Sequence, residues 1–113
     1  MGTHRLIVFT EPVAGREAEY NKWYDEVHLK DVLEVEGFKA AQRFEIAPTQ
    51  IGAPGEPAPN RYLAIYEIEA DSLEIALEKL NAGAGTMVIS DALDGDRATA
   101  IAYSAIGERQ VSS

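Results

Sequence analysis

Two short segments, His4–Thr10 and Arg61–Glu69, carry apolar side chains on both faces of a predicted β-strand. In the first segment, Ile7 and Phe9 lie on one face and Leu6 lies on the other. A strand that is apolar on both faces needs cover on both sides, so each segment is predicted to be an interior strand of a sheet. This requirement constrains the fold more than any other feature of the sequence.

The remaining segments alternate between helical and extended patterns. The predicted elements are a helix over 16–33, an edge strand over 38–46, a helix over 71–83 and a strand over 97–107. Residues 48–59 hold four prolines and two glycines, which predicts a long hairpin loop. Residues 83–96 have no readable period and are predicted to be irregular.

Local signals define the faces and ends of these elements. In the first helix, Tyr20, Trp23, Tyr24 and Val27 recur at spacings of three and four, which predicts one buried stripe. Gly37 ends that helix. In the second helix, Leu73, Ala76, Leu77 and Leu80 form the apolar stripe, Asp71 is the predicted N-cap with Glu74 three residues on, and Gly83 is the predicted end.

The order βαββαβ predicts an α+β, ferredoxin-like fold made of one domain over residues 1–113. Right-handed crossovers in this split βαβ arrangement place the first and third strands in the middle of a four-stranded antiparallel sheet. Those are the two strands identified above as apolar on both faces, so two separate observations agree.

The second face of the sheet is predicted to bind another copy of the chain. Two helices cover only one face, and the other face would carry Ile7 or Leu6 beside Leu63 or Tyr62. A monomer would leave this face as a large exposed apolar patch. An isologous homodimer, packed sheet to sheet, is the expected solution.

Charge and composition exclude several classes of function. The chain has ten Lys and Arg against nineteen Asp and Glu, a net charge of −9, and no cysteine. Such an acidic surface repels phosphate backbones and anionic lipid, so neither nucleic acid nor a membrane is an expected partner. With no apolar segment of spanning length and no leader pattern, we expect a cytoplasmic protein.

The segment Glu19–Phe38 (EYNKWYDEVHLKDVLEVEGF) resembles the first helix of the EthD-like family of dimeric α/β barrels. The family pattern reads roughly N-x-W-Y-D-x-x-H-[LI]-P-D-V-L, followed by P-G-F. The strand Ala41–Phe44, the hairpin rich in Pro and Gly and the strand Tyr62–Glu67 also look like that family. Lys30 and Glu36 stand where the family usually has proline, and without the first proline the helix is expected to run on past His28.

The resemblance implies a dimeric α/β barrel within a superfamily of enzymes that need no cofactor. Relatives with this barrel include monooxygenases without cofactor, muconolactone isomerase, polyketide cyclases and decarboxylases, and lyases of aromatic compounds. Many EthD-like members have no assigned reaction. The family therefore narrows the chemistry without choosing it.

His28 is the first candidate for a catalytic residue. Helical spacing puts it at the edge of the apolar stripe, where a neutral imidazole would accept a proton from an activated carbon or a phenol. Asp31 and Asp25 lie one turn to either side, and either would orient the ring. We predict Asp31 in that role. The alternative is a structural histidine bonded to a backbone carbonyl.

Aromatic and apolar side chains are predicted to line a substrate pocket beside His28. The predicted set is Phe9, Trp23, Tyr24, Tyr62, Tyr66 and Met87. Tyr62 and Tyr66 share one face of their strand, and either phenol would bind a substrate carbonyl or phenolate. Phe44 and Tyr103 belong to the same aromatic inventory, and a core role is the alternative for each aromatic residue.

The roles predicted for the polar residues near this pocket are less specific. Arg43 is placed on the polar face of the second strand with Lys39 and Glu45, where a salt bridge to Glu45 or Glu67 is favoured over a substrate carboxylate. In the irregular stretch, Ser90, Asp91 and Asp94 would line a pocket mouth, with Met87 and Val88 pointing inward. An ordinary loop is the alternative.

The sequence gives little support for a metal site or a nucleotide-binding site. Asp25, His28 and Asp31 recur at intervals of three, but the only other histidine is His4. An iron or zinc site usually has a second imidazole, so no metal is predicted. No glycine-rich phosphate loop follows a strand and no serine sits on a nucleophile elbow, so no cofactor is expected either.

The sequence thus predicts a lyase, isomerase or cyclase that needs no cofactor and acts on an apolar, aromatic or polyketide-like substrate. A monooxygenase without cofactor is the near alternative. The second alternative is a protein that binds the same ligand without turnover, and the third alternative is a barrel that only mediates assembly.

Overall fold

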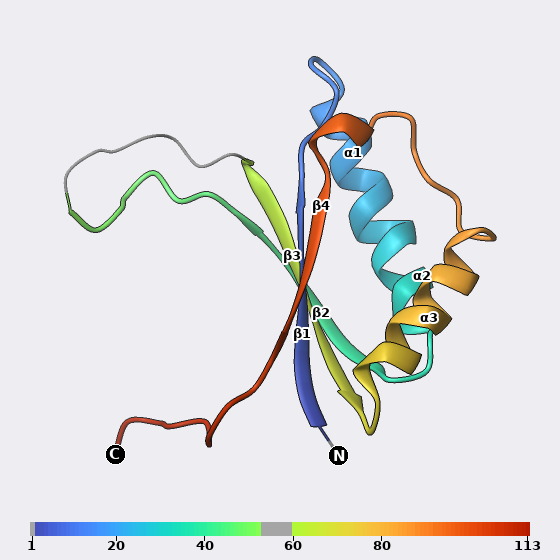
Figure 1. Cartoon of the computed structure of the whole chain (residues 1–113). Helices are drawn as coiled ribbons and strands as arrows, with labels where there is room; N and C mark the ends of the chain where they lie inside the picture. Colours follow the sequence, from blue (N-terminus) through green and yellow to red (C-terminus); the bar gives the residue numbers. More distant parts are fainter. Residues whose placement is uncertain (1, 53–59) are drawn as a thin grey trace.

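The computed structural model describes residues 2–52 and 60–113 and has the predicted order of elements (Figure 1). The elements are β1 (Gly2–Thr10), α1 (Glu17–Trp23), the π-helical turn η1 (Tyr24–His28), α2 (Leu29–Leu33), β2 (Phe38–Glu45), β3 (Tyr62–Ala70), α3 (Leu73–Ala84), the 3-10 turn η2 (Gly95–Arg97) and β4 (Thr99–Ser104). None of the described helices is both long enough and apolar enough to cross a membrane.

The four strands form one antiparallel sheet in the order β2-β3-β1-β4. The two strands predicted to be interior, β1 and β3, are the central pair. Leu6 lies opposite Tyr66 and Ile7 opposite Ile65 in their shared register. The predicted ferredoxin-like α+β fold is therefore confirmed.

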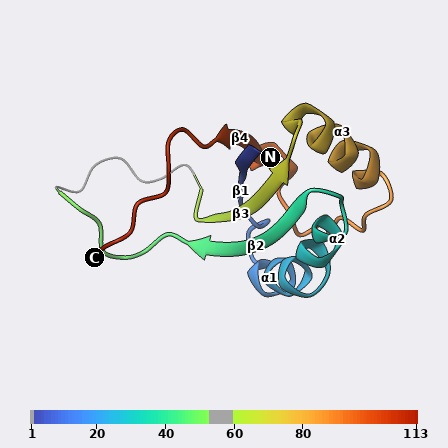
Figure 2. The ribbon, with the colours of Figure 1, turned by 90° about the horizontal axis from the view of Figure 1, so that it is seen from below.

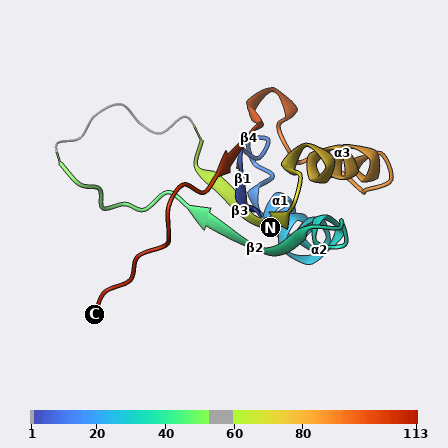
Figure 3. The same ribbon diagram turned by 60° about the horizontal axis from the view of Figure 1, so that its bottom comes forward.

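All the helices lie on one side of the sheet (Figures 1 and 2). On that helix face, Leu6, Thr10, Ala64, Tyr66 and Ile68 are buried. The opposite face, which we call the open face, presents apolar residues without cover from any described helix. Figure 3 shows the C-terminal tail leaving the sheet on the side away from the helices.

A β-bulge in β2 changes which side chains face the helices. Phe38 pairs with Ile68, but the next paired residue is Ala40, opposite Glu67, so Lys39 is an extra residue. The inserted residue reverses the alternation that follows. Arg43 therefore lies on the helix face and not beside Lys39 as predicted, and its ion pair is with Asp25 and not with Glu45 or Glu67.

The first helix contains a π-helical turn that also shifts its phase. The helix runs without a break from α1 through η1 into α2, past the position of Lys30, as expected. A π-turn inserts an additional residue relative to regular α-helical spacing. The predicted buried stripe accordingly fails at Val27, which is 37% exposed, while Tyr20, Trp23 and Tyr24 are buried.

The other boundaries differ from prediction by a few residues. Ser72, not Asp71, caps α3, because its side chain accepts a hydrogen bond from the Ile75 amide. The last strand is shorter than predicted because η2 precedes it. Gly37, with φ of 97°, follows the first helix as predicted. Residues 48–52 of the predicted hairpin loop are irregular, and its residues 53–59 lie outside those that the structure describes.

Candidate active site

The candidate site is centred on His28, the last residue of η1. Its half-buried imidazole stacks on Trp23, with 4.8 Å between ring centroids and 22° between planes. The Tyr24 ring meets the same imidazole in a T-shaped arrangement, with 5.1 Å between ring centroids. The end of α1 and the π-turn η1 thus bring three aromatic rings together.

The imidazole of His28 has an unusual polar environment. Its Nδ1 atom is buried and has no hydrogen-bond partner among the described residues. The predicted alternative, a histidine fixed by a backbone carbonyl, is therefore not seen at Nδ1. Burial lowers the pKa of His28, and the nearby Asp31 charge opposes that shift only in part. The ring is consequently neutral at pH 7 and able to accept a proton.

Tyr66, on β3, provides a second buried polar atom. Its hydroxyl has no well-formed hydrogen bond in the described chain but interacts with the Tyr24 hydroxyl, and the residue is 1% exposed. Burial, followed by the neighbouring Tyr24, raises the pKa of Tyr66, so the phenol stays protonated and can donate. Tyr24 thus neighbours both Tyr66 and His28.

Tyr20 is a buried phenol with a well-formed hydrogen bond. Tyr20 is fully buried, as is typical of a core aromatic, and its hydroxyl forms a hydrogen bond with Thr10. Burial raises the pKa of Tyr20, while that bond lowers it. Tyr20 thus avoids the cost of leaving a buried polar group unpaired, which is about 1–3 kcal/mol.

Arg43 forms the sheet side of the group, a placement that the sequence reading missed. Its guanidinium carbon lies 4.6 Å from the centroid of the Tyr24 ring and 5.2 Å from that of Tyr20. Its two terminal nitrogens donate to Asp25 at 2.9 Å and to Asn21 at 2.8 Å. The β-bulge that turns Arg43 inward left no signal in the sequence.

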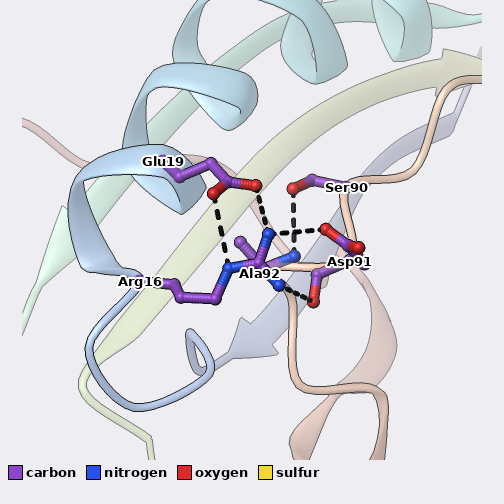
Figure 4. A network of polar contacts seen from close by, with 5 residues as sticks. All are labelled: Arg16, Glu19, Ser90, Asp91 and Ala92. Atoms are coloured by element: carbon purple, nitrogen blue, oxygen red, sulfur yellow. Dashed lines mark hydrogen bonds and ion pairs between the residues drawn. The ribbon is translucent and has the colours of Figure 1, made fainter.

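The segment that follows α3 is attached across the first helix. The Trp23 indole donates to the Val88 carbonyl at 2.8 Å. Further along, Arg16 binds the Asp91 carboxylate at 2.7 Å and also pairs with Glu19 (Figure 4). The Val13 amide donates to the Ala92 carbonyl at 2.7 Å. These bonds hold residues 88–92 over the edge of the helix layer.

A groove of about 470 Å³ lies between α2 and this segment. It is lined by Val27, Asp31, Glu34, Val35, Gly83, Thr86, Met87 and Val88. Val27 and Asp31 flank His28 along the chain, and Val88 is bonded to the indole that stacks on His28. The groove thus borders chain neighbours of His28, while His28, Trp23 and Tyr24 are not among its lining residues.

The predicted site residues are only partly brought together. Trp23, Tyr24 and Tyr66 surround or adjoin the His28 group, and Met87 lines the groove with Asp31. Tyr62 lies further along the helix face, 5.3 Å from Tyr20 between ring centroids. Phe9 is on the open face, where it lines a separate cavity of about 250 Å³ with Phe44 and Leu63. Phe9 thus lies apart from the rest.

The polar residues predicted for the site also lie in different environments. Asp31 influences His28 through its charge, with no hydrogen bond between them in the described chain, and Asp25 is bound to Arg43. Ser90 accepts from the Ala92 amide and Asp94 from the Asp96 amide, which are ordinary loop contacts. Within residues 2–52 and 60–113, no three His, Asp or Glu side chains gather as a metal site would require.

Comparisons with known proteins connect this fold to solved structures. No family model and no curated protein matches the sequence. A candidate monooxygenase from Shewanella loihica PV-4 matches with a TM-score of 0.59 and 14% identity, over 96% of this chain and 99% of its own. An ethyl tert-butyl ether D (EthD) family protein from Bacillus halodurans C-125 matches with a TM-score of 0.59 and 16% identity, over 97% and 100%.

The chain has an EthD-like fold. HapK from Hahella chejuensis shares it, with a TM-score of 0.54 and 11% identity over the full length of both chains. At such identities the likeness concerns the fold alone. The EthD-like resemblance predicted from Glu19–Phe38 is confirmed at that level, and the chemistry has to be argued from the side chains.

Proposed function

We propose that this chain is a cytoplasmic enzyme, independent of any cofactor, that uses His28 as general acid and base on a small apolar substrate. The observation that carries the proposal is the buried His28 Nδ1, which has no hydrogen-bond partner in the described chain and lies beside the ring of Tyr24, whose phenol interacts with that of Tyr66. Unsatisfied buried polar atoms are rare in folded proteins and cost stability. A ligand with a polar group would satisfy the imidazole.

The chemistry that these groups support is proton transfer. The neutral imidazole takes a proton from an activated C–H or a phenolic O–H, a contribution of about 10²–10⁴ in rate. The Tyr66 phenol, which stays protonated, donates a hydrogen bond to the oxygen on which negative charge develops. Asp31 stabilises the imidazolium by its charge, so it acts on His28 and not on the substrate.

The proposed substrate is aromatic or polyketide-like, and the reaction is that of a lyase, isomerase or cyclase. Aromatic rings such as those of Trp23, Tyr24 and His28 favour packing against another flat apolar ring. The groove of about 470 Å³, with Val35 and Met87 in its lining, provides a way in. Its volume falls in the usual range of ligand sites, about 300–1,000 Å³.

We also propose that the protein works as a homodimer joined through the open face. Phe44, Ile101 and Tyr103 are 43%, 40% and 57% exposed on that face. Exposed apolar residues on both edge strands of one sheet face are typical of a protein interface. The dimer would cover β1 and β3 on their second side, as their sequences require.

A monooxygenase without cofactor is the second candidate function. Its support is the Shewanella loihica structure, which is described as a candidate monooxygenase. The same base would then form a phenolate that reacts with dioxygen. An oxygen electrode separates the two reactions, because a lyase, isomerase or cyclase consumes no dioxygen. A ligand-binding protein without turnover is the third.

The experiment that tests the proposal is an NMR pH titration of both imidazoles in the presence of phenolic fragments. A His28→Gln variant assigns the resonances, and His4, which bonds to Ser104 and does not line the groove, serves as the internal reference. We expect the His28 midpoint to lie below about 6.5 and to move with a fragment that leaves His4 in place. A His28 resonance that responds to no fragment would contradict the proposal.

A further inference from the structure

The guanidinium of Arg43 is held more firmly than a surface salt bridge requires. The side chain is 13% exposed, and its fork is fixed by Asp25 and Asn21. The cation also lies over the rings of Tyr20, Tyr24 and Tyr62, at 5.2, 4.6 and 5.5 Å from their centroids. Five side chains therefore fix one buried charge against the ring that adjoins His28.

The charge pair of Arg43 and Asp25 is unequally exposed to water. The Asp25 side chain is 59% exposed, so solvent screens its negative charge more than it screens the guanidinium. Toward the protein interior, the pair therefore acts as a net positive charge. Its reach is visible at Tyr24 and Tyr66, where the Arg43 charge lowers each pKa against the larger effect of burial.

The positive charge lies against the ring that connects the groups of the proposed site. Arg43 lies over Tyr24, which also adjoins His28 and interacts with Tyr66. The chain as a whole carries a charge of −9, which disfavours anions. Any preference for an anionic oxygen must therefore come from local groups, and Arg43 is placed to provide it.

We propose that Arg43 is a positioning residue that makes the His28–Tyr24–Tyr66 group select ligands whose oxygen carries or develops negative charge, such as phenols and enols. This inference rests on the proposed function of the same site and adds the class of ligand. Arg43 acts through the Tyr24 ring and the local field and does not touch the substrate. The acidic groove rim of Asp31 and Glu34 favours entry of the neutral form.

The test measures the ionisation of bound 4-nitrophenol, whose neutral and anionic forms have different visible spectra. The ratio of its affinities as anion and as neutral phenol is obtained from binding at several pH values. Arg43→Met removes the charge, and Arg43→Lys keeps it. Arg61→Met is the matched control, because Arg61 also lies over Tyr62, at 4.9 Å, but is 41% exposed and paired with Glu11.

We expect Arg43→Met to lower the affinity ratio by about tenfold or more, since a nearby opposite charge shifts a pKa by about 1–3 units. Arg43→Lys should keep most of the preference, and Arg61→Met should leave it unchanged. An Arg43→Met protein that binds the two forms in the wild-type ratio overturns the inference, whatever its stability, since a purely structural role would not move this ratio.

Asp25→Asn is a second variant, and it is expected to change the affinity ratio in the opposite direction. It removes a mostly exposed carboxylate and leaves the guanidinium, so the preference for the anion should rise about two- to fivefold, the effect of an exposed charge pair. No rise would overturn the inference even if Arg43→Met fails to fold. If 4-nitrophenol moves His28 but both ratios stay constant, only this inference fails. If it neither binds nor moves His28, the proposed function fails with it.

Discussion

Trp23 and His28 stack with their ring centroids 4.8 Å apart, and the same indole donates its N–H to the Val88 carbonyl at 2.8 Å. One side chain thus connects the candidate base to the segment that borders the groove. A movement of that segment would shift the indole and, with it, the imidazole stacked on the indole. The connection gives the first of four predictions.

Trp23→Phe should separate the two roles of the indole. Phenylalanine keeps an aromatic ring against His28 but loses the bond to Val88, at a cost of about 1 kcal/mol in the free energy of unfolding. The amide protons of residues 86–90 should then exchange faster. Urea unfolding and hydrogen exchange measure the two effects.

Val88→Ala is the matched control for this prediction. The bond uses the Val88 carbonyl, and the side chain is 66% exposed, so the variant should stay within about 0.5 kcal/mol of the wild type. Unchanged exchange in Trp23→Phe would show that the indole does not hold the segment in solution.

The lowered pKa of His28 predicts that stability falls with acid in a defined window. As the pH falls through about 6.5, the unfolded chain takes up a proton on this residue, whereas the native ring takes it up only at lower pH. Between the two pKa values the unfolded state binds more protons, so the free energy of unfolding decreases as the pH decreases. His28→Gln should remove this part of the slope.

Asp31→Asn tests the direction of this pH dependence over the same pH range. The Asp31 charge raises the pKa of His28 against the larger effect of burial. Without that charge the native pKa falls further, and the loss of stability should continue to lower pH than in the wild type. Urea unfolding at several pH values between 7 and 5 measures both slopes. Equal slopes in wild type and His28→Gln would rule out a buried neutral imidazole.

Tyr66→Phe should abolish binding of phenolic fragments at little cost in stability. The Tyr66 hydroxyl is buried with no well-formed hydrogen bond in the described chain and interacts only weakly with the Tyr24 hydroxyl, so its removal should change the free energy of unfolding by less than about 1 kcal/mol. Tyr20→Phe is the control, because it leaves buried Thr10 unpaired and should cost about 1–2 kcal/mol. A Tyr66→Phe variant that loses as much stability as Tyr20→Phe would mean that the Tyr66 hydroxyl has a well-formed hydrogen bond in solution.

The fold was predictable from the sequence because its strongest signal is physical and local. The apolar faces of β1 and β3 identify interior strands, and right-handed crossovers in a βαββαβ chain place the same two strands at the centre of the sheet. The Leu73 to Leu80 stripe on α3 was equally clear. Element ends were less certain, since Asp71 and Ser72 are both good caps and only the backbone decides between them.

The candidate site was less predictable because two inserted residues interrupt the helical and strand periodicities from which the side-chain directions were predicted. The π-turn at Tyr24–His28 moves Val27 outward and breaks a regular stripe. The bulge at Lys39 moves Arg43 from the predicted polar face to the rings of Tyr20 and Tyr24. A periodic pattern assumes an uninterrupted helix or strand, so it cannot reveal either insertion.

The open face gives the last prediction, that Ile101→Lys converts a dimer into a monomer. Ile101 lies on β4 opposite Ile7 and is 40% exposed, so lysine there is compatible with a folded single chain. Between two sheets, the same lysine would be buried without a partner, at a cost of several kcal/mol. Ile75→Lys on the outer side of α3, at 52% exposure, is the matched control and should leave the mass unchanged. Analytical ultracentrifugation distinguishes the outcomes, and a wild-type protein with the mass of one chain would show that the open face does not pair.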